Sequence, residues 1–114
     1  MKAIAAALLL ALAPIGARAG EEPAWDCHHT SIVRNFGGSA WRVYACDATH
    51  MALVSEPGSA AAPYAFQLDF TDDGVVVSGT GQGDRKAADA AYADIAKLSD
   101  GEVKALLAGA MAQR

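Results

Sequence analysis

The character of this sequence changes within one segment, from Gly74 to Leu98 (GVVVSGTGQGDRKAADAAYADIAKL). Before it, apolar residues alternate with a period of two, which is typical of strands; after it they recur every three to four residues, which is typical of amphipathic helices. Strands that are followed by helices, rather than alternating with them, predict an α+β domain. We expect an antiparallel sheet of four or five strands in hairpins, and two short helices packed on one of its faces.

The segments that we expect to form strands are 30–36, 39–47, 50–55, 64–70 and 75–78. The clearest is YAFQLDF at 64–70, where aromatic and leucine side chains occupy every second position. Asp73-Gly74 favours a type I′ hairpin turn. The intervening segment 56–63 (EPGSAAAP) contains nothing that could pack, so it is predicted to be a mobile loop.

Two helices are predicted after the glycine-rich bend. The first spans 85–98 with Asp84 as its N-cap, and the second follows a capping box formed by Ser99 and Glu102. The apolar stripe of the first comprises Ala88, Ala91, Tyr92 and Ile95. The stripe of the second comprises Val103, Leu106, Leu107, Ala110 and Met111.

The first 19 residues have the features of a secretory signal peptide. Lys2 is followed by an uncharged apolar run at 3–13, and Ala17-Arg18-Ala19 fits an A-x-A cleavage site. The run is shorter than the roughly 20 residues that a membrane-spanning helix needs. We therefore expect residues 1–19 to be removed, leaving residues 20–114 as one small domain that is periplasmic or secreted and not inserted in the membrane.

The charge balance argues against nucleic-acid binding. Of the nine basic residues, the predicted cleavage removes Lys2 and Arg18, which leaves seven against thirteen acidic residues. An acidic domain without a basic stripe repels nucleic acid and anionic membrane surfaces.

The two cysteines, Cys27 and Cys46, predict a disulfide, because an even number of cysteines in an exported chain is usually oxidised. A hairpin centred between Phe36 and Gly37 would place them directly opposite each other. The same register puts Trp41 opposite Ile32 and Tyr44 opposite His29.

Two further patterns contain residue types that can carry chemistry. Cys27, His29, Cys46 and His50 would come near one end of the sheet, and two Cys with two His are a ligand set for zinc or copper. The spacing lacks a C-x₂-C element, so a structural disulfide is favoured over this alternative. No nucleophile-elbow motif accompanies the serines and histidines, so catalysis is not expected.

The bend formed by Gly79, Gly81 and Gly83 precedes a helix N-terminus, which is where phosphates bind in some folds. Its spacing is not G-x-G-x-x-G. Arg85 and Lys86 in the first helical turn could draw a small anion to the bend, or they could be solvated charges. The bend is a candidate ligand site, but glycines that let the helix pack closely explain it more simply.

Trp25 and Trp41 are candidate anchors for a protein partner if they are exposed together. The sequence thus predicts a small exported, non-catalytic domain with a structural disulfide and no cofactor, which binds a protein or small ligand in the cell envelope. Metal handling by the Cys/His cluster is the alternative.

Overall fold

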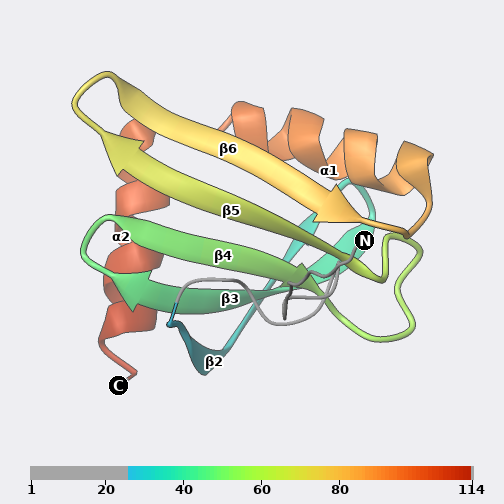
Figure 1. The fold of residues 1–114 in the computed structure, drawn as a ribbon, viewed down its shortest axis with the longest axis horizontal. Helices are drawn as coiled ribbons and strands as arrows, with labels where there is room; N and C mark the ends of the chain where they lie inside the picture. The colour runs from blue at the N-terminus through green and yellow to red at the C-terminus, as the bar shows by residue number, and fades with distance from the viewer. Residues whose placement is uncertain (1–25, 114) are drawn as a thin grey trace, which may run out of the picture.

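The computed structural model describes residues 26–113, which form one antiparallel sheet and two helices (Figure 1). Each strand pairs with its neighbour in sequence, so the sheet order is β2-β3-β4-β5-β6. The strands are β2 (His28–Phe36), β3 (Ser39–Asp47), β4 (His50–Ser55), β5 (Tyr64–Thr71) and β6 (Gly74–Gly81). The helices are α1 (Arg85–Ala96) and α2 (Asp100–Met111). The predicted α+β class is confirmed, whereas the predicted signal peptide at 1–19 lies outside the described residues.

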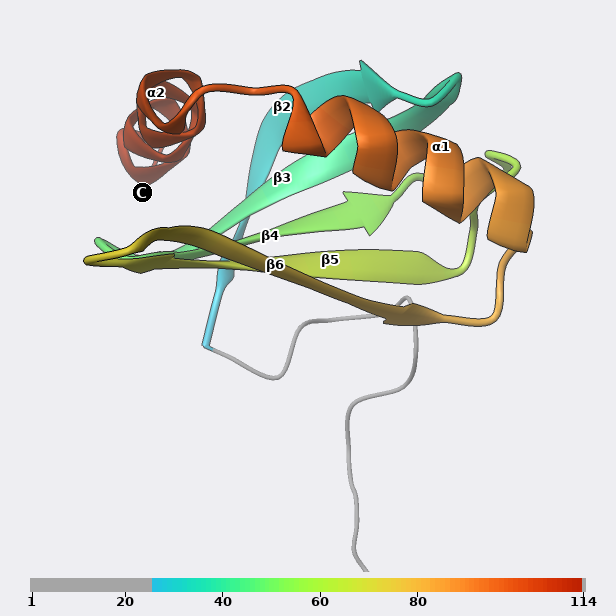
Figure 2. The ribbon, with the colours of Figure 1, turned by 90° about the horizontal axis from the view of Figure 1, so that it is seen from above.

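Both helices cover the same face of the sheet (Figure 2). The core lies between them and the strands, and its largest fully buried side chains are Trp41, Val43, Met51, Leu53 and Leu68. They alternate along the three inner strands, as the period-two pattern predicts. The indole Nε1–H of Trp41 donates to the carbonyl oxygen of Phe36 at 3.2 Å, so this buried polar group is satisfied.

The helix caps follow the sequence closely. Asp84 Oδ2 accepts a hydrogen bond from the Ala87 amide at 3.0 Å, and Ser99 and Glu102 form the predicted reciprocal capping box. α1 ends at Ala96, two residues before the predicted end. One member of its predicted apolar stripe is wrong: Tyr92 is 49% exposed, because it lies at the rim of the interface, where its ring is 6.3 Å from that of Phe66.

The pairing of β2 with β3 confirms one half of the predicted hairpin register and corrects the other. His29 lies opposite Tyr44, as predicted. However, Arg34 rather than Ile32 lies opposite Trp41, because the register shifts part-way along β2. The centre of the turn is consequently one residue further along the chain than predicted.

At the register shift, a side chain makes hydrogen bonds in place of the backbone. From His29 to Val33, β2 advances four residues while β3 advances two, from Tyr44 to Arg42. Within this bulge the hydroxyl of Thr30, which is buried, donates to the carbonyl oxygen of Val43 at 2.6 Å and accepts from the Ile32 amide at 3.1 Å. The Thr30 hydroxyl thereby pairs with backbone groups that would bond to the neighbouring strand in a regular ladder.

The tip of this hairpin is held against α1. Gly37 has a φ of +61°, and a Cβ at this position would collide with the backbone of Ala90 and Ala91. Its amide donates to the Asp94 carboxylate at 2.6 Å. A glycine is therefore required here both by the backbone conformation and by the close approach of the helix.

The loop at 56–63 packs more closely than predicted. Ala61 is fully buried, and a Cβ on Gly83 would collide with its carbonyl group. The amides of Gln82 and Gly83 both donate to the carbonyl oxygen of Pro63, at 2.9 and 3.0 Å. The expectation that nothing in this loop packs was wrong, because its short side chains allow two backbone segments to approach each other.

Two glycine substitutions should have opposite effects. A Cβ at Gly109 in α2 would meet only the Ile32 side chain, at 3.9 Å, so Gly109→Ala should stabilise the fold by about 1 kcal/mol through helix propensity. Gly37→Ala should destabilise it by more than about 1 kcal/mol, because the added methyl group has no room. Urea unfolding monitored by tryptophan fluorescence measures both, and equal effects of the two would contradict the packing of the hairpin tip on α1.

Candidate functional site

The predicted disulfide is present. Cys27 and Cys46 are bonded, with Cα atoms 3.9 Å apart, and the described residues contain no free cysteine. The alternative metal site at Cys27, His29, Cys46 and His50 is therefore wrong, because oxidised sulfurs are not thiolate ligands. Within residues 26–113, no group of three or more His, Cys, Asp or Glu side chains is arranged to hold a metal ion.

The two adjacent histidines point to opposite sides of β2. His28 Nε2 lies 3.1 Å from the carbonyl oxygen of Ala110 near the end of α2, whereas the His29 ring makes an edge contact with Tyr44, with ring centroids 5.7 Å apart. The amide of Ser31 donates to the Gln113 side chain at 2.8 Å. The contacts of His28 and Ser31 tie the first strand to the last helix.

The glycine-rich segment is mostly strand rather than bend. Gly79 and Gly81 belong to β6, and the chain leaves the sheet only at Gln82 and Gly83. A Cβ at Gly79 would lie 2.8 Å from the Tyr64 ring and 2.9 Å from the Phe66 ring, so this glycine makes room for aromatic side chains of β5.

No observation supports an anion site at this place. The carboxylate of Asp84 caps the N-terminus of α1, where an anion would have to sit. Arg85 and Lys86 are both exposed and follow this cap. The glycines thus serve packing, although against β5 rather than against the helix as we had expected.

Trp41 cannot act as an exposed anchor for a partner, because it is fully buried in the core. The other candidate, Trp25, lies outside the described residues. The prediction of an exposed tryptophan pair is corrected: the alternation that placed Trp41 on the same face as Val43 and Ala45 already indicated the core.

A feature that the sequence reasoning missed is a groove of about 550 Å³ between α2 and the two turns at one end of the sheet. Its apolar part is formed mainly by Phe70, Leu107 and Met111. The remaining lining residues are Ala48, Thr49, Thr71, Asp72, Lys104 and Ala108. Phe70 and Met111 are only half-buried, so apolar surface is open to solvent here.

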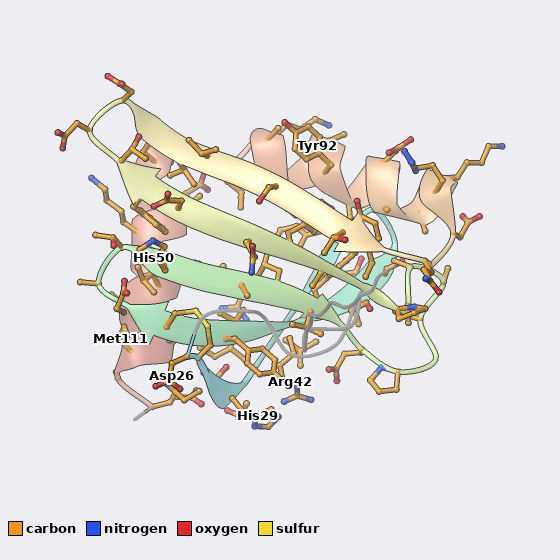
Figure 3. The ribbon with its side chains drawn as sticks, viewed as in Figure 1. Asp26, His29, Arg42, His50, Tyr92 and Met111 are labelled. Carbon is orange, nitrogen blue, oxygen red and sulfur yellow. A yellow bond between two sulfur atoms is a disulfide. The ribbon has the colours of Figure 1, made fainter. Side chains whose placement is uncertain are left out.

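Beside this groove, His50 is held between two carboxylates. Its Nδ1 lies 2.8 Å from Asp47 Oδ1, and its Nε2 lies 3.3 Å from Asp69 Oδ1. The hydroxyl of Thr49 donates to the same Asp47 oxygen at 3.1 Å and lies 3.1 Å from His50 Nδ1. Figure 3 shows His50 at the same end of the molecule as Met111.

This cluster contains the residue types of a hydroxyl–histidine–carboxylate triad but not its hydrogen bonding. In a triad, one ring nitrogen accepts the proton of the nucleophile while the other donates to a carboxylate. Here the Thr49 hydroxyl donates to Asp47, and both nitrogens of His50 face carboxylates. The backbone amide of Thr49 at 2.8 Å and the His50 ring lower the pKa of the Asp47 carboxyl. Asp47 therefore stays ionised and acts as a structural hydrogen-bond acceptor rather than as a general base.

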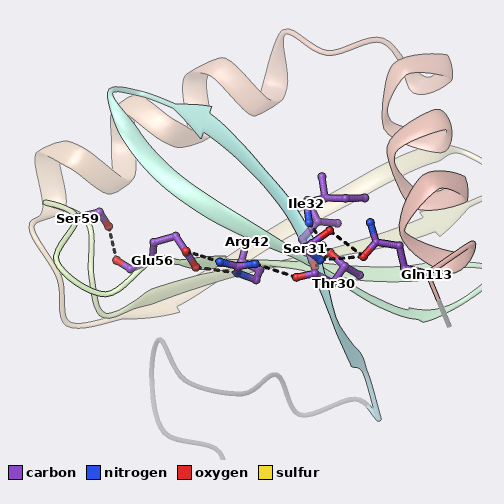
Figure 4. Close-up of polar contacts among 8 residues, drawn as sticks. Thr30, Ser31, Ile32, Arg42, Glu56, Ser59 and Gln113 are labelled. Carbon is purple, nitrogen blue, oxygen red and sulfur yellow. Dashed lines mark hydrogen bonds and ion pairs between the residues drawn. The ribbon is translucent and has the colours of Figure 1, made fainter.

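A second polar group connects the 56–63 loop to the bulge in β2 (Figure 4). Arg42 donates two hydrogen bonds to the Glu56 carboxylate, at 2.7 and 3.0 Å, and a third to the carbonyl oxygen of Thr30 at 3.0 Å. The bonds with Arg42 lower the pKa of the Glu56 carboxyl. The bidentate geometry fixes Arg42 across the sheet.

A smaller groove of about 350 Å³ lies near the junction of the helices and is lined by Arg34, Phe36, Leu98, Glu102, Ala105 and Leu106.

Comparison with protein-family models, with curated proteins and with solved structures finds no match for this chain. In the part of the chain that the structure describes, neither helix is long and apolar enough to cross a membrane.

Removing the disulfide should lower the stability of the domain substantially. Cys27 and Cys46 are 19 residues apart, and closing a loop of this size stabilises a fold by about 3 kcal/mol in the chain-entropy model. The Cys27→Ser/Cys46→Ser variant should therefore unfold at a much lower urea concentration than the oxidised protein. An unchanged midpoint would show that β2 is held without the bond.

Acid should weaken the fold through Glu56. Its folded-state pKa is lowered, so its contribution is complete above the unfolded-state value of about 4.3 and is lost as the pH falls through the folded value. Glu56→Gln should cost about 1 kcal/mol at pH 7 and less at pH 3. Urea midpoints at both pH values measure this, with Asp89→Asn on the exposed side of α1 as the control. An equal loss at both pH values would contradict the role of the ion pair.

Proposed function

We propose that this chain is a non-catalytic binding domain of an oxidising, extracytoplasmic compartment, and that the groove beside α2 is its ligand site. The observation that carries the proposal is the groove itself. Its volume of about 550 Å³ falls within the usual range of small-molecule sites, which are mostly apolar with a few polar groups at the rim.

The lining favours an amphipathic ligand. Phe70, Leu107 and Met111 offer an apolar surface, while Lys104 supplies a charged donor at its border. Lys104 is exposed and carries the only positive charge among the lining residues. We infer a ligand with a short aliphatic or aromatic body and an anionic head group, whether it is a free molecule or part of a larger partner in the cell envelope.

The neighbouring polar cluster supports binding rather than catalysis. The Thr49 hydroxyl directs its proton to Asp47, so His50 does not activate it. The carboxylates of Asp47 and Asp69 hold the His50 ring in place. This cluster fixes the turn that carries Thr49 into the groove. Among the described residues, the pKa values of four groups are shifted, those of Arg42, Asp47, Glu56 and Glu102, and each shift is explained by hydrogen bonds that stabilise the fold.

The compartment is inferred from the disulfide. Bonds of this kind persist in secreted and periplasmic proteins and are rare in the cytosol. The predicted signal peptide agrees with this location, and the acidic balance of the chain is consistent with a ligand other than nucleic acid.

The test is binding of octanoate, followed by amide NMR shifts, with octylammonium as the probe of opposite charge. We expect octanoate to bind with a dissociation constant on the order of 1 mM and to shift residues that line the groove. Ala108→Phe should abolish binding, because it places a ring in the groove from an exposed position. Lys104→Gln should weaken binding a few-fold, as expected for an exposed charge pair.

Matched controls separate this site from the rest of the surface. Ala105→Phe places the same ring on the same helix but in the smaller groove, and Lys97→Gln removes an equivalent charge from the end of α1. Both should leave binding unchanged. Shifts that survive Ala108→Phe, or equal binding of both probes, would refute the groove as an amphipathic anion site.

A further inference from the structure

The two edges of the sheet differ sharply in how they are protected. An exposed edge strand offers unpaired backbone groups to other chains, and proteins usually block it with bulges, charges or covering segments. The β2 edge has these devices: a register shift, the exposed Arg34, and a Gln113 side chain that accepts from the Ser31 amide. Part of this edge is thus blocked for further pairing.

The β6 edge has neither a bulge nor a charge in the described structure. Its eight residues contain no charge and no proline, and its pairing with β5 runs without a register shift over the whole strand. In the described part of the chain β5 is its only neighbour in the sheet. α1 runs beside β6 on the helical face (Figure 1), but it stands clear of the plane of the strand (Figure 2). Alternate residues of such an edge direct their N–H and C=O groups outward, ready to pair with another strand.

Apolar side chains lie on both faces of this edge. Val76 is 56% exposed on the face away from the helices. On the helical face Tyr92 is 49% exposed, and its contact with Phe66 places it above Gly79, which pairs with Phe66 in the ladder. Val33 is the third large apolar residue exposed among the described positions, so one of the three lies in β6 and another lies above it.

The charges at the two ends of β6 are opposite. Asp72 and Asp73 precede the strand, and Arg85 and Lys86 follow it, all four exposed. The one acid between the strand and these bases is Asp84, whose carboxylate caps α1. A two-fold axis perpendicular to the sheet would pair β6 antiparallel with its own copy, so that the acidic end of each strand meets the basic end of the other.

We propose that β6 is a self-association surface, and that its occupant is β6 of a second copy of this chain. The pairing joins two sheets into one continuous ten-stranded sheet. It covers Val76 in both copies, and it satisfies the outward backbone groups. It does not involve the α2 groove, so it stands or falls independently of the proposed ligand.

Sedimentation velocity of the disulfide-bonded protein, from about 1 μM to about 1 mM, tests this proposal. We expect a dimer whose dissociation constant rises at least about tenfold in Val76→Lys/Ser78→Lys, because like charges then face each other across the axis. The matched control is Val33→Lys/Asn35→Lys on the exposed side of β2, which should leave the dimer unchanged. Circular dichroism confirms that each variant is folded.

A charge exchange tests the antiparallel geometry. Asp73→Lys should weaken the dimer, and adding Lys86→Glu to it should restore the affinity, because each lysine then meets a glutamate of the other copy. A protein that is monomeric at every concentration would overturn the proposal and leave the edge to a different chain. A dimer that responds to the β2 lysines, or that is indifferent to those on β6, would overturn it as well.

Discussion

The hydrogen bonds of the Thr30 hydroxyl allow the two ends of the β2–β3 hairpin to keep different pairing registers. One end requires Cys27 to lie opposite Cys46, and the other requires Gly37 to sit at the turn beneath α1. These requirements belong to registers that differ by two residues, and a regular ladder meets only one of them. Inside the sheet, the Thr30 hydroxyl bonds to the carbonyl oxygen of Val43 at the point where the register shifts. Arg42 donates to the carbonyl oxygen of Thr30 in the same bulge. The position of α1 and the covalent link therefore both depend on one buried hydroxyl.

Much of the fold was predictable from the sequence because it depends on local rules. The alternation of Trp41, Val43 and Ala45, the cap at Asp84 and the capping box at Ser99 each specify structure within a few residues. The register of β2 was not predictable in this way: the local Phe36-Gly37 signal and the cysteine pair agreed on one centre, and nothing nearby indicated a bulge. Tyr92 likewise follows the helical period, and only the position of the sheet edge leaves it exposed.

The candidate sites were harder to predict, because surfaces are formed by segments distant in sequence. The groove combines Thr49, Phe70 and Lys104, which no spacing rule connects. The Cys/His cluster was recognisable, yet its chemistry depends on oxidation and on the directions of the side chains. His28 and His29 diverge across the strand, and His50 is occupied by Asp47 and Asp69. Residue types that suggest ligands in a sequence thus serve as structural hydrogen-bonding groups here.

The contacts between the first strand and the last helix have a consequence for the order of folding. His28 bonds to the carbonyl group of Ala110, 82 residues away, and Ser31 bonds to Gln113. The strands of the meander pair with their sequence neighbours and so close short loops, which is fast, whereas this junction closes a loop that spans nearly the whole domain. The hairpins can therefore pair early during folding. The contacts of α2 with β2 form only when the two ends of the domain meet, so the domain becomes fully native when its last helix docks.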